Sequence, residues 1–152
     1  MEPQTMTAHP TKIVYATEGM LLNVLGDTPT VKLSGKDTGG KFTIISQNNP
    51  PGVGIPMHVH ENEDEVFKVL EGQIEFDTQG KKTILSAGDM IFLPRRIPHA
   101  FQVVGNQNAK ALVTAYPSGI EDMFEELAAL PAGPPDFEKV FEICGRFGVA
   151  FL

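Results

Sequence analysis

The stretch 52-GVGIPMHVHENEDEVFKVLEG-72 decides how this chain can be interpreted. Within eight positions it holds His58, His60 and Glu65, three side chains that can bind a metal ion. A fourth such side chain, His99, lies in a second stretch punctuated by glycine and proline, 88-GDMIFLPRRIPHAF-101. The chain has four histidines, and three of them fall in these two stretches. Candidate functional residues are therefore concentrated in two short parts of the sequence.

The spacing of these residues places a condition on the local structure. His58 and His60 are two residues apart, which on an extended strand puts both side chains on one face with Cα atoms about 6.5–7 Å apart. Glu65 lies an odd number of residues beyond His60, so one unbroken strand would aim it at the opposite face. We therefore expect a turn or bulge in the acidic segment 61–64 that aims Glu65 at the histidines. The neighbouring carboxylates are interpreted as a solvated turn: Glu61, Glu63 and Asp64.

Nitrogen and oxygen ligands define the metals that this set could hold. Three imidazoles and one carboxylate suit a divalent first-row transition metal, namely Fe, Mn, Ni, Co, Cu or Zn. They leave one or two coordination positions for water or substrate. Cys144 is the one cysteine, which excludes a zinc-thiolate cluster and an internal disulfide and fits a reducing compartment. We expect Cys144 to be a buried apolar position on a helix.

Length, composition and charge exclude several classes of protein. The 152 residues, of which 41% are hydrophobic, are typical of one globular domain. The net charge of -7 argues against binding nucleic acid, which requires a basic surface. No apolar run is long enough to span a membrane, so we expect no membrane partner. The polar N-terminus does not have the pattern of a signal peptide, and we expect a cytoplasmic protein.

Most of the chain has the pattern of a β protein. Short apolar or β-branched runs, separated by glycine, proline and asparagine, follow one another from Ile13 to Tyr116. Roughly ten such runs with no helix between them predict an antiparallel sandwich or barrel over residues 13–116. Residues 1–12 are expected to form a flexible N-terminal arm.

After the last predicted strand the pattern becomes helical. Ser118 and Glu121 have the spacing of a capping box and predict the start of one helix. Asp136 predicts the N-cap of a second helix, with Gly148 just beyond its end. The second helix has an apolar stripe of Phe137, Val140, Phe141 and Cys144. We expect residues 117–152 to form a helical extension that packs on the barrel.

The two glycine-flanked stretches resemble the two motifs of the cupin superfamily. The first family motif is Gly, five residues, His-x-His, three or four residues, Glu, six residues and Gly; it is filled here by Gly52, His58, His60, Glu65 and Gly72. The second motif is Gly, five residues, Pro-x-Gly, two residues, His, three residues and Asn. It is matched by Gly88, Pro94 and His99, while Arg96 stands at the usual Gly and Val103 at the usual Asn.

The resemblance implies a double-stranded β-helix, which is a jelly-roll barrel with a metal inside. The implied metal ligands are His58, His60, Glu65 and His99. Glu65 would also be the catalytic general base toward a substrate hydroxyl or carbon acid. The C-terminal segment is similar to single-domain cupins described as quercetin-dioxygenase-like. Because single-domain cupins usually associate through their sheets, we also expect a homodimer that covers the outward-facing Val66 and Leu70.

The resemblance implies a function class and leaves the chemistry open. We expect a metal-dependent dioxygenase that acts on a small-molecule substrate, flavonol-like or otherwise enolic or polyphenolic. The alternatives are a cupin isomerase or lyase and a non-catalytic cupin that binds a metal and a small molecule. Candidate residues for the wall of the substrate pocket are Phe42, Ile44, Met57, Phe67, Val69, Phe101 and Val103. Arg95 and Arg96 are expected at the surface, although either could reach the mouth of the pocket.

Overall fold

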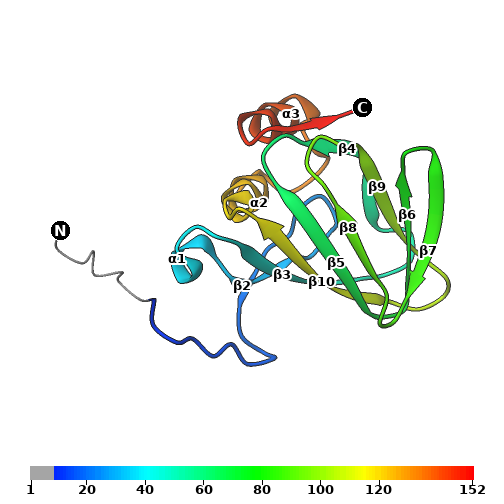
Figure 1. The fold of residues 1–152 in the computed structure, drawn as a ribbon. Coiled ribbons are helices and arrows are strands. Elements are labelled where there is room, and N and C mark those ends of the chain that lie inside the picture. Colours follow the sequence, from blue (N-terminus) through cyan, green and yellow to red (C-terminus); the bar gives the residue numbers. More distant parts are fainter. Residues whose placement is uncertain (1–8) are drawn as a thin grey trace, which may run out of the picture.

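Two antiparallel sheets face each other and form a jelly-roll barrel in this computed structural model, which describes residues 9–152 (Figure 1). The first sheet has six strands in the order β1 (Met20–Leu21), β2 (Thr30–Leu33), β3 (Thr43–Asn49), β10 (Ala109–Tyr116), β5 (Asp64–Glu71) and β8 (Met90–Leu93). The second has five, in the order β11 (Val149–Phe151), β4 (Gly54–His60), β9 (His99–Val104), β6 (Gln73–Thr78) and β7 (Lys81–Ser86). The mainly β jelly-roll architecture expected from the sequence is confirmed.

Three short helices accompany the sheets: α1 (Gly35–Thr38), α2 (Ile120–Ala128) and α3 (Phe137–Arg146). α2 and α3 stand together beside one end of the barrel (Figure 1). Within residues 9–152, no helix has the length and apolar character needed to cross a membrane. Of the N-terminal arm predicted over residues 1–12, the first eight residues lie outside the described part of the chain.

Alternation of buried and exposed residues along the strands gives the barrel its interior. In β5 the buried residues are Glu65, Phe67 and Val69, two apart, as expected for one face of a strand. Phe67 packs against Phe76 and Phe101, with ring centroids 5.2 Å apart in both pairs. Burial of one such ring contributes roughly 1.5–3 kcal/mol. An apolar core therefore fills the middle of the barrel, next to the face that Glu65 shares.

The first strand expected from the sequence, at Ile13–Tyr15, is wrong. Residues 9–15 pair with no strand, and the Ile13 and Tyr15 side chains are 67% and 65% exposed. An apolar run favours extended backbone, but a strand also needs a partner strand, and in the six-stranded sheet β2 pairs with β1 and β3 and not with this segment. The first barrel strand therefore begins at Met20.

The helical segment packs on the barrel, with differences in detail. Asp136 caps α3 as predicted, accepting a hydrogen bond from the Lys139 backbone N–H at 3.3 Å. Ser118 does not cap α2, because Gly119, with φ 129°, is the N-cap residue. The residues of the two helices that join the core are Ile120, Met123, Leu127, Val140, Ile143 and Cys144. Cys144 is buried as expected, and burial raises the pKa of its thiol.

The chain ends in a strand that the sequence did not predict. After α3 it turns at Gly148, where φ is 76°, and β11 pairs with β4 so that Val149 is opposite His60 and Phe151 is opposite His58. The stripe predicted on α3 is partly wrong, since Phe137 and Phe141 are 58% and 52% exposed and Ile143 is buried instead. The C-terminal segment is thus part of the sheet that carries His58, His60 and His99.

The turn before β9 explains why a glycine is usual in the second motif. Arg96 occupies that position with a left-handed φ of 67°, and its backbone N–H donates to the His60 carbonyl at 2.7 Å. A residue with a Cβ in this conformation costs about 1–2 kcal/mol relative to the right-handed region. Its side chain compensates only through an exposed ion pair with Glu61, with Nε and Oε1 2.9 Å apart.

We expect Arg96→Gly to be more stable than Arg96→Ala by about 1 kcal/mol, because glycine relieves the left-handed strain and alanine keeps it. Both variants remove the ion pair with Glu61, so their difference isolates the backbone effect. Urea unfolding of the two variants measures it. Equal unfolding free energies would contradict the strain at this turn.

Candidate metal centre

The three histidines come from two neighbouring strands of the five-stranded sheet. His58 and His60 lie at the end of β4, and His99 begins β9 directly opposite His58. One nitrogen of each ring lies within 4.8 Å of the others. All three side chains are buried, between 2% and 5% exposed. The structure thus brings together the imidazoles of His58, His60 and His99, which come from two separate stretches of the sequence.

Glu65 reaches the histidines because the chain turns between β4 and β5. β4 ends at His60 and β5 begins at Asp64, so residues 61–63 form a turn between the two strands. This turn is the one expected from the odd spacing between His60 and Glu65. The two oxygens of Glu65 then lie 3.6 Å from His60 Nε2 and 3.3 Å from His99 Nε2. The carboxylate therefore lies between the Nε2 atoms of His60 and His99.

Electrostatic coupling links Glu65 and His60. Burial would raise the pKa of Glu65, but the imidazoles of His60 and His99 outweigh burial and hold that pKa below its ordinary value. Burial would lower the pKa of His60, but Glu65 and Glu63 raise it above its ordinary value. Without another cation, a proton on His60 is thus the charge that best balances Glu65.

His58 is in the opposite situation. Burial, with a smaller contribution from His99, lowers the pKa of His58 to about 4, so the ring is uncharged at neutral pH. Its Nδ1 lies 2.8 Å from the carbonyl oxygen of Pro56. That contact places the proton on Nδ1 and leaves Nε2 as the atom with a free lone pair, which is the form that binds a metal.

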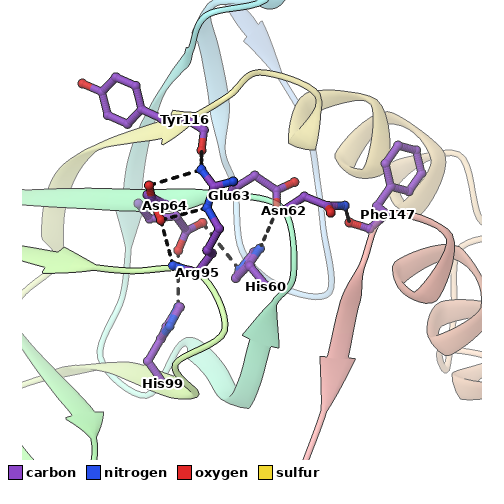
Figure 2. Close-up of polar contacts among 9 residues, drawn as sticks. His60, Asn62, Glu63, Asp64, Arg95, His99, Tyr116 and Phe147 are labelled. Atoms are coloured by element: carbon purple, nitrogen blue, oxygen red, sulfur yellow. Dashed lines mark hydrogen bonds and ion pairs between the residues drawn. The ribbon is translucent and has the colours of Figure 1, made fainter.

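Glu63 contacts the outer nitrogen of His60. Its Oε2 lies 3.4 Å from His60 Nδ1 (Figure 2). Glu63 is buried, with only 4% of the residue exposed. The solvated reading of Glu63 is therefore wrong, because the tight turn folds this side chain back onto the histidine three residues before it. A carboxylate at the outer nitrogen of a metal-binding histidine orients the ring and raises its basicity.

The buried charges of the barrel do not balance. Within residues 9–152 the buried carboxylic acids are Asp27, Glu63, Glu65 and Glu121, and no lysine or arginine is buried. Ionised carboxylates in an apolar interior are costly unless a positive charge or hydrogen bonds compensate them. His99 adds an unmet need, since both of its ring nitrogens, including the Nε2 that faces Glu65, are buried without a hydrogen-bond partner. The donor set therefore fits a divalent cation held by the three imidazoles, with Glu65 completing the ligands.

A cavity of about 70 Å³ lies between the sheets at this cluster. His58, His60 and Glu65 line it together with Asp27 and Gln47. Phe67 and Phe101, expected in the pocket wall, also line it, whereas Val69 and Val103 are buried in the core without reaching it. The cavity thus combines ligand-type side chains with an apolar wall.

Three residues expected in that wall are elsewhere. Phe42, Ile44 and Met57 do not line the cavity. In β3 the buried positions are Thr43, Ile45 and the alternate residues that follow, so the strand register is one residue away from the one assumed. Met57 likewise precedes the buried His58 and belongs to the other face of β4. Phe42 instead packs near the ring of Tyr116, with centroids 6.0 Å apart.

A larger groove of about 890 Å³ lies next to the cavity. The loop from Leu127 to Phe137 forms one side of it, and none of the three histidines lines it. The cavity and the groove share four lining residues: Leu25, Ile55, Leu127 and Phe151. These four side chains form the partition between the candidate metal centre and the groove.

Arg95 and Arg96 lie on the surface, as expected. Arg95 makes a two-pronged ion pair with Asp64, with nitrogen–oxygen distances of 3.1 and 3.2 Å, and also donates to the Tyr116 carbonyl (Figure 2). Neither arginine lines the cavity. Arg95 fastens the loop before β9 to Asp64 at the start of β5, whereas the ion pair between Arg96 and Glu61 is exposed at the surface.

Sequence reasoning missed Glu63, Asp27 and Gln47. The spacing of Glu63 from His60 matches a turn that folds back, but its acidic neighbours made solvation the simpler interpretation. Asp27 follows Gly26, and a Gly-Asp pair in a sequence indicates only a turn. Gln47 follows the buried alternation of β3 and could have been found with the correct register.

Known proteins share the fold and the motif region. Residues 46–115 match the family described as the cupin domain. A quercetin 2,3-dioxygenase of Bacillus subtilis is 32% identical over 74 residues, which is 49% of this chain and 22% of that protein. An oxalate-binding protein of Thermotoga maritima is 33% identical over 63 residues, 41% of this chain and 52% of that protein. These alignments span only part of the relatives' lengths.

A solved structure extends the likeness beyond the motifs. The polyketide cyclase RemF from Streptomyces resistomycificus superimposes with a TM-score of 0.62 and 27% identity, over 70% of this chain and 80% of that one. Its name and those of the sequence relatives describe three different functions. The common element is therefore the barrel, and not one reaction.

We expect Glu63→Gln to weaken the binding of Co²⁺ about 10–100-fold, because the amide lacks the negative charge that raises the basicity of His60. Glu61→Gln makes the same chemical change at an exposed position of the same turn and should leave the affinity unchanged. Competition with a chromophoric chelator measures both. An unchanged affinity in Glu63→Gln, with the fold intact by circular dichroism, would contradict this role.

Proposed function

We propose that this chain, which belongs to the cupin superfamily, is a metal-dependent dioxygenase acting on an enolic or polyphenolic small molecule such as a flavonol. One observation carries the proposal: His58, His60, His99 and Glu65 converge inside the barrel, and three of them, His58, His60 and Glu65, line a buried cavity. Within the described residues no lysine or arginine is buried there to balance the carboxylate.

Each of these residues has a part in the proposal. The three imidazoles and Glu65 would hold one divalent first-row ion, which supplies Lewis-acid and redox chemistry when bound. Glu65 stays ionised because its pKa is held low, so its carboxylate can take the proton of a substrate hydroxyl. Phe67 and Phe101 give the cavity an apolar wall that excludes water from the ionised substrate.

The dimensions of the cavity define how a flavonol would be bound. About 70 Å³ accommodates the chelating end of such a molecule and not its rings, since pockets for molecules of that size usually measure about 300–1,000 Å³. The groove of about 890 Å³ beyond the partition has the room for the rings. The proposal therefore requires the side chains of Leu25, Ile55 and Phe151 to move apart when the substrate binds.

The size of the cavity also favours a second candidate. A non-catalytic protein that binds a metal and a compact molecule would need only the inner 70 Å³. The relative named as an oxalate-binding protein supports this second candidate. The relative named as a quercetin 2,3-dioxygenase supports the dioxygenase. An isomerase or lyase would use the same four residues. Turnover in the presence of oxygen separates the dioxygenase from both alternatives.

The protein is loaded separately with Fe²⁺, Mn²⁺, Co²⁺ or Ni²⁺ and mixed with quercetin in air-saturated buffer. We expect the sample with at least one of these metals to consume oxygen. Glu65→Gln should lower the rate about 10²–10⁴-fold, because the amide cannot accept a proton. Glu61→Gln, on the exposed side of the same turn, is the matched control and should keep the rate. An oxygen electrode measures all three proteins. Oxygen uptake with none of the four metals would contradict the dioxygenase proposal.

We propose in addition that the chain forms a homodimer through the outer face of β5 and β8. Leu70, Met90 and Phe92 on these strands are 44%, 60% and 60% exposed, and Val66 pairs with Phe92 across the strands. Exposed apolar side chains grouped on one face favour a protein contact. A cytoplasmic location belongs to the same proposal, because a reducing environment keeps the single free thiol of Cys144 unoxidised.

Light scattering at micromolar concentration should give twice the mass of one chain, and Phe92→Glu should give a single-chain mass. The change places a charge in the centre of the proposed contact, where desolvation is costly. Ile84→Glu, at a residue that is 52% exposed on the other sheet, is the control and should stay dimeric. A wild-type protein with the mass of one chain would contradict the dimer.

A further inference from the structure

A hairpin between β1 and β2 carries a carboxyl group into the cavity of the candidate metal centre. Val24 and Asp27 pair through two backbone hydrogen bonds of 2.8 and 3.0 Å around the two-residue turn Leu25-Gly26. Both turn residues have positive φ, 53° and 88°. Leucine rarely adopts this conformation, so the surrounding structure holds the turn against strain. The result is an Asp27 side chain that is 5% exposed and lines the cavity.

Two buried amides hold the Asp27 carboxylate. Gln47 Nε2 donates to Asp27 Oδ2 at 3.0 Å, and Asn49 Nδ2 donates to Asp27 Oδ1 at 2.7 Å. The orientation of the Asn49 amide is fixed from its other side, because its oxygen accepts from the Thr28 backbone N–H at 3.3 Å. Asp27 is thereby presented as an acceptor of hydrogen bonds and not as a donor.

The acceptor capacity of Asp27 is not used up by these contacts. An ionised carboxylate has about four acceptor positions on its two oxygens, and the contacts with the two amides and with the Thr28 backbone leave at least one of them open. No lysine or arginine is buried within residues 9–152, so no cation neutralises this group. Burial accordingly raises the pKa of Asp27 above its ordinary value. A hydrogen-bond donor that entered the cavity would find an acceptor already desolvated and oriented.

The other wall residues make Asp27 unusual for its surroundings. Val24, Ile45, Val113 and Met123, which also line the cavity, are apolar and buried. Across the same cavity lie His58 and His60 from the opposite sheet. A ligand in this space would therefore contact the candidate metal centre on one side and the Asp27 carboxylate on the other.

We propose that Asp27, oriented by Gln47 and Asn49, binds a hydroxyl group of the ligand whose chelating oxygens lie at the histidines. This inference rests on the proposed function, because it assumes that the ligand is held at that centre. It defines the ligand class more narrowly: an enolic chelator that bears a second hydroxyl group. It disfavours a dianion such as oxalate, since a second carboxylate would face Asp27 without an intervening proton.

A matched pair of probes tests the hydroxyl contact. Kojic acid and allomaltol are hydroxypyranones with the same chelating oxygens, and they differ only in a hydroxymethyl group where allomaltol has a methyl group. Each is titrated, without oxygen, into the Co²⁺-loaded protein, and the visible spectrum of cobalt reports binding. We expect the wild type to bind kojic acid about tenfold more tightly than allomaltol, as a hydrogen bond to a charged acceptor predicts.

Asp27→Asn keeps the shape of the side chain and removes its charge. In this variant the preference for kojic acid should fall to about twofold or less, while the affinity for oxalate should rise. Asp89→Asn, in an exposed turn, is the control and should keep the wild-type preference. The comparison of the two pyranones in the wild type does not depend on the folding of any variant.

The outcomes separate this inference from the function on which it rests. If both pyranones perturb the cobalt spectrum with equal affinity, Asp27 does not contact the ligand, while the centre remains. If the preference is present and survives in Asp27→Asn, another residue provides it, and the role of Asp27 is again overturned. If neither pyranone perturbs the spectrum, the proposed enolic ligand itself is wrong.

Discussion

The burial of negative charge without a fixed positive charge is the constraint on which the site depends. Glu63 and Glu65 lie inside the barrel beside three imidazoles, and no lysine or arginine is buried in the described part of the chain. In such surroundings an ionised carboxylate persists only with compensation. The protein alone can supply it by protonating His60, whose pKa is raised. A divalent cation would supply more charge and would leave every imidazole neutral.

The architecture serves to bring these groups together. Strand alternation turns His58 and His60 inward, and the turn at residues 61–63 returns Glu65 to the same space. Pairing of β4 with β9 then adds His99 from a distant part of the chain. The outer contacts of the imidazoles, to the Pro56 carbonyl and to Glu63, orient the inner nitrogens. The pairing of the strands thus sets the positions of the histidines and Glu65, and the ionisable side chains themselves provide the charge of the site.

The sequence was sufficient where the physics is local. Period-2 alternation placed His58 and His60 on one face of a strand, and the parity of Glu65 predicted the turn that follows them. Prediction from the sequence failed where the structure of a segment depends on strands that lie far away in the chain. Phe42 and Ile44 were misassigned because an apolar strand does not reveal which face is inside, and β11 is too short to be recognised without β4 beside it. Asp27 and Glu63 were missed because only the folded barrel shows that these acidic turn residues are buried.

Metal content measures the central claim most directly. Elemental analysis of the purified protein should find about one divalent first-row ion per chain, as a single site of three imidazoles and one carboxylate predicts. His58→Ala and His99→Ala, from two different strands, should each lose that ion while the barrel remains folded. Metal retained in both variants at the wild-type level would show that the ion is bound elsewhere and would contradict the account.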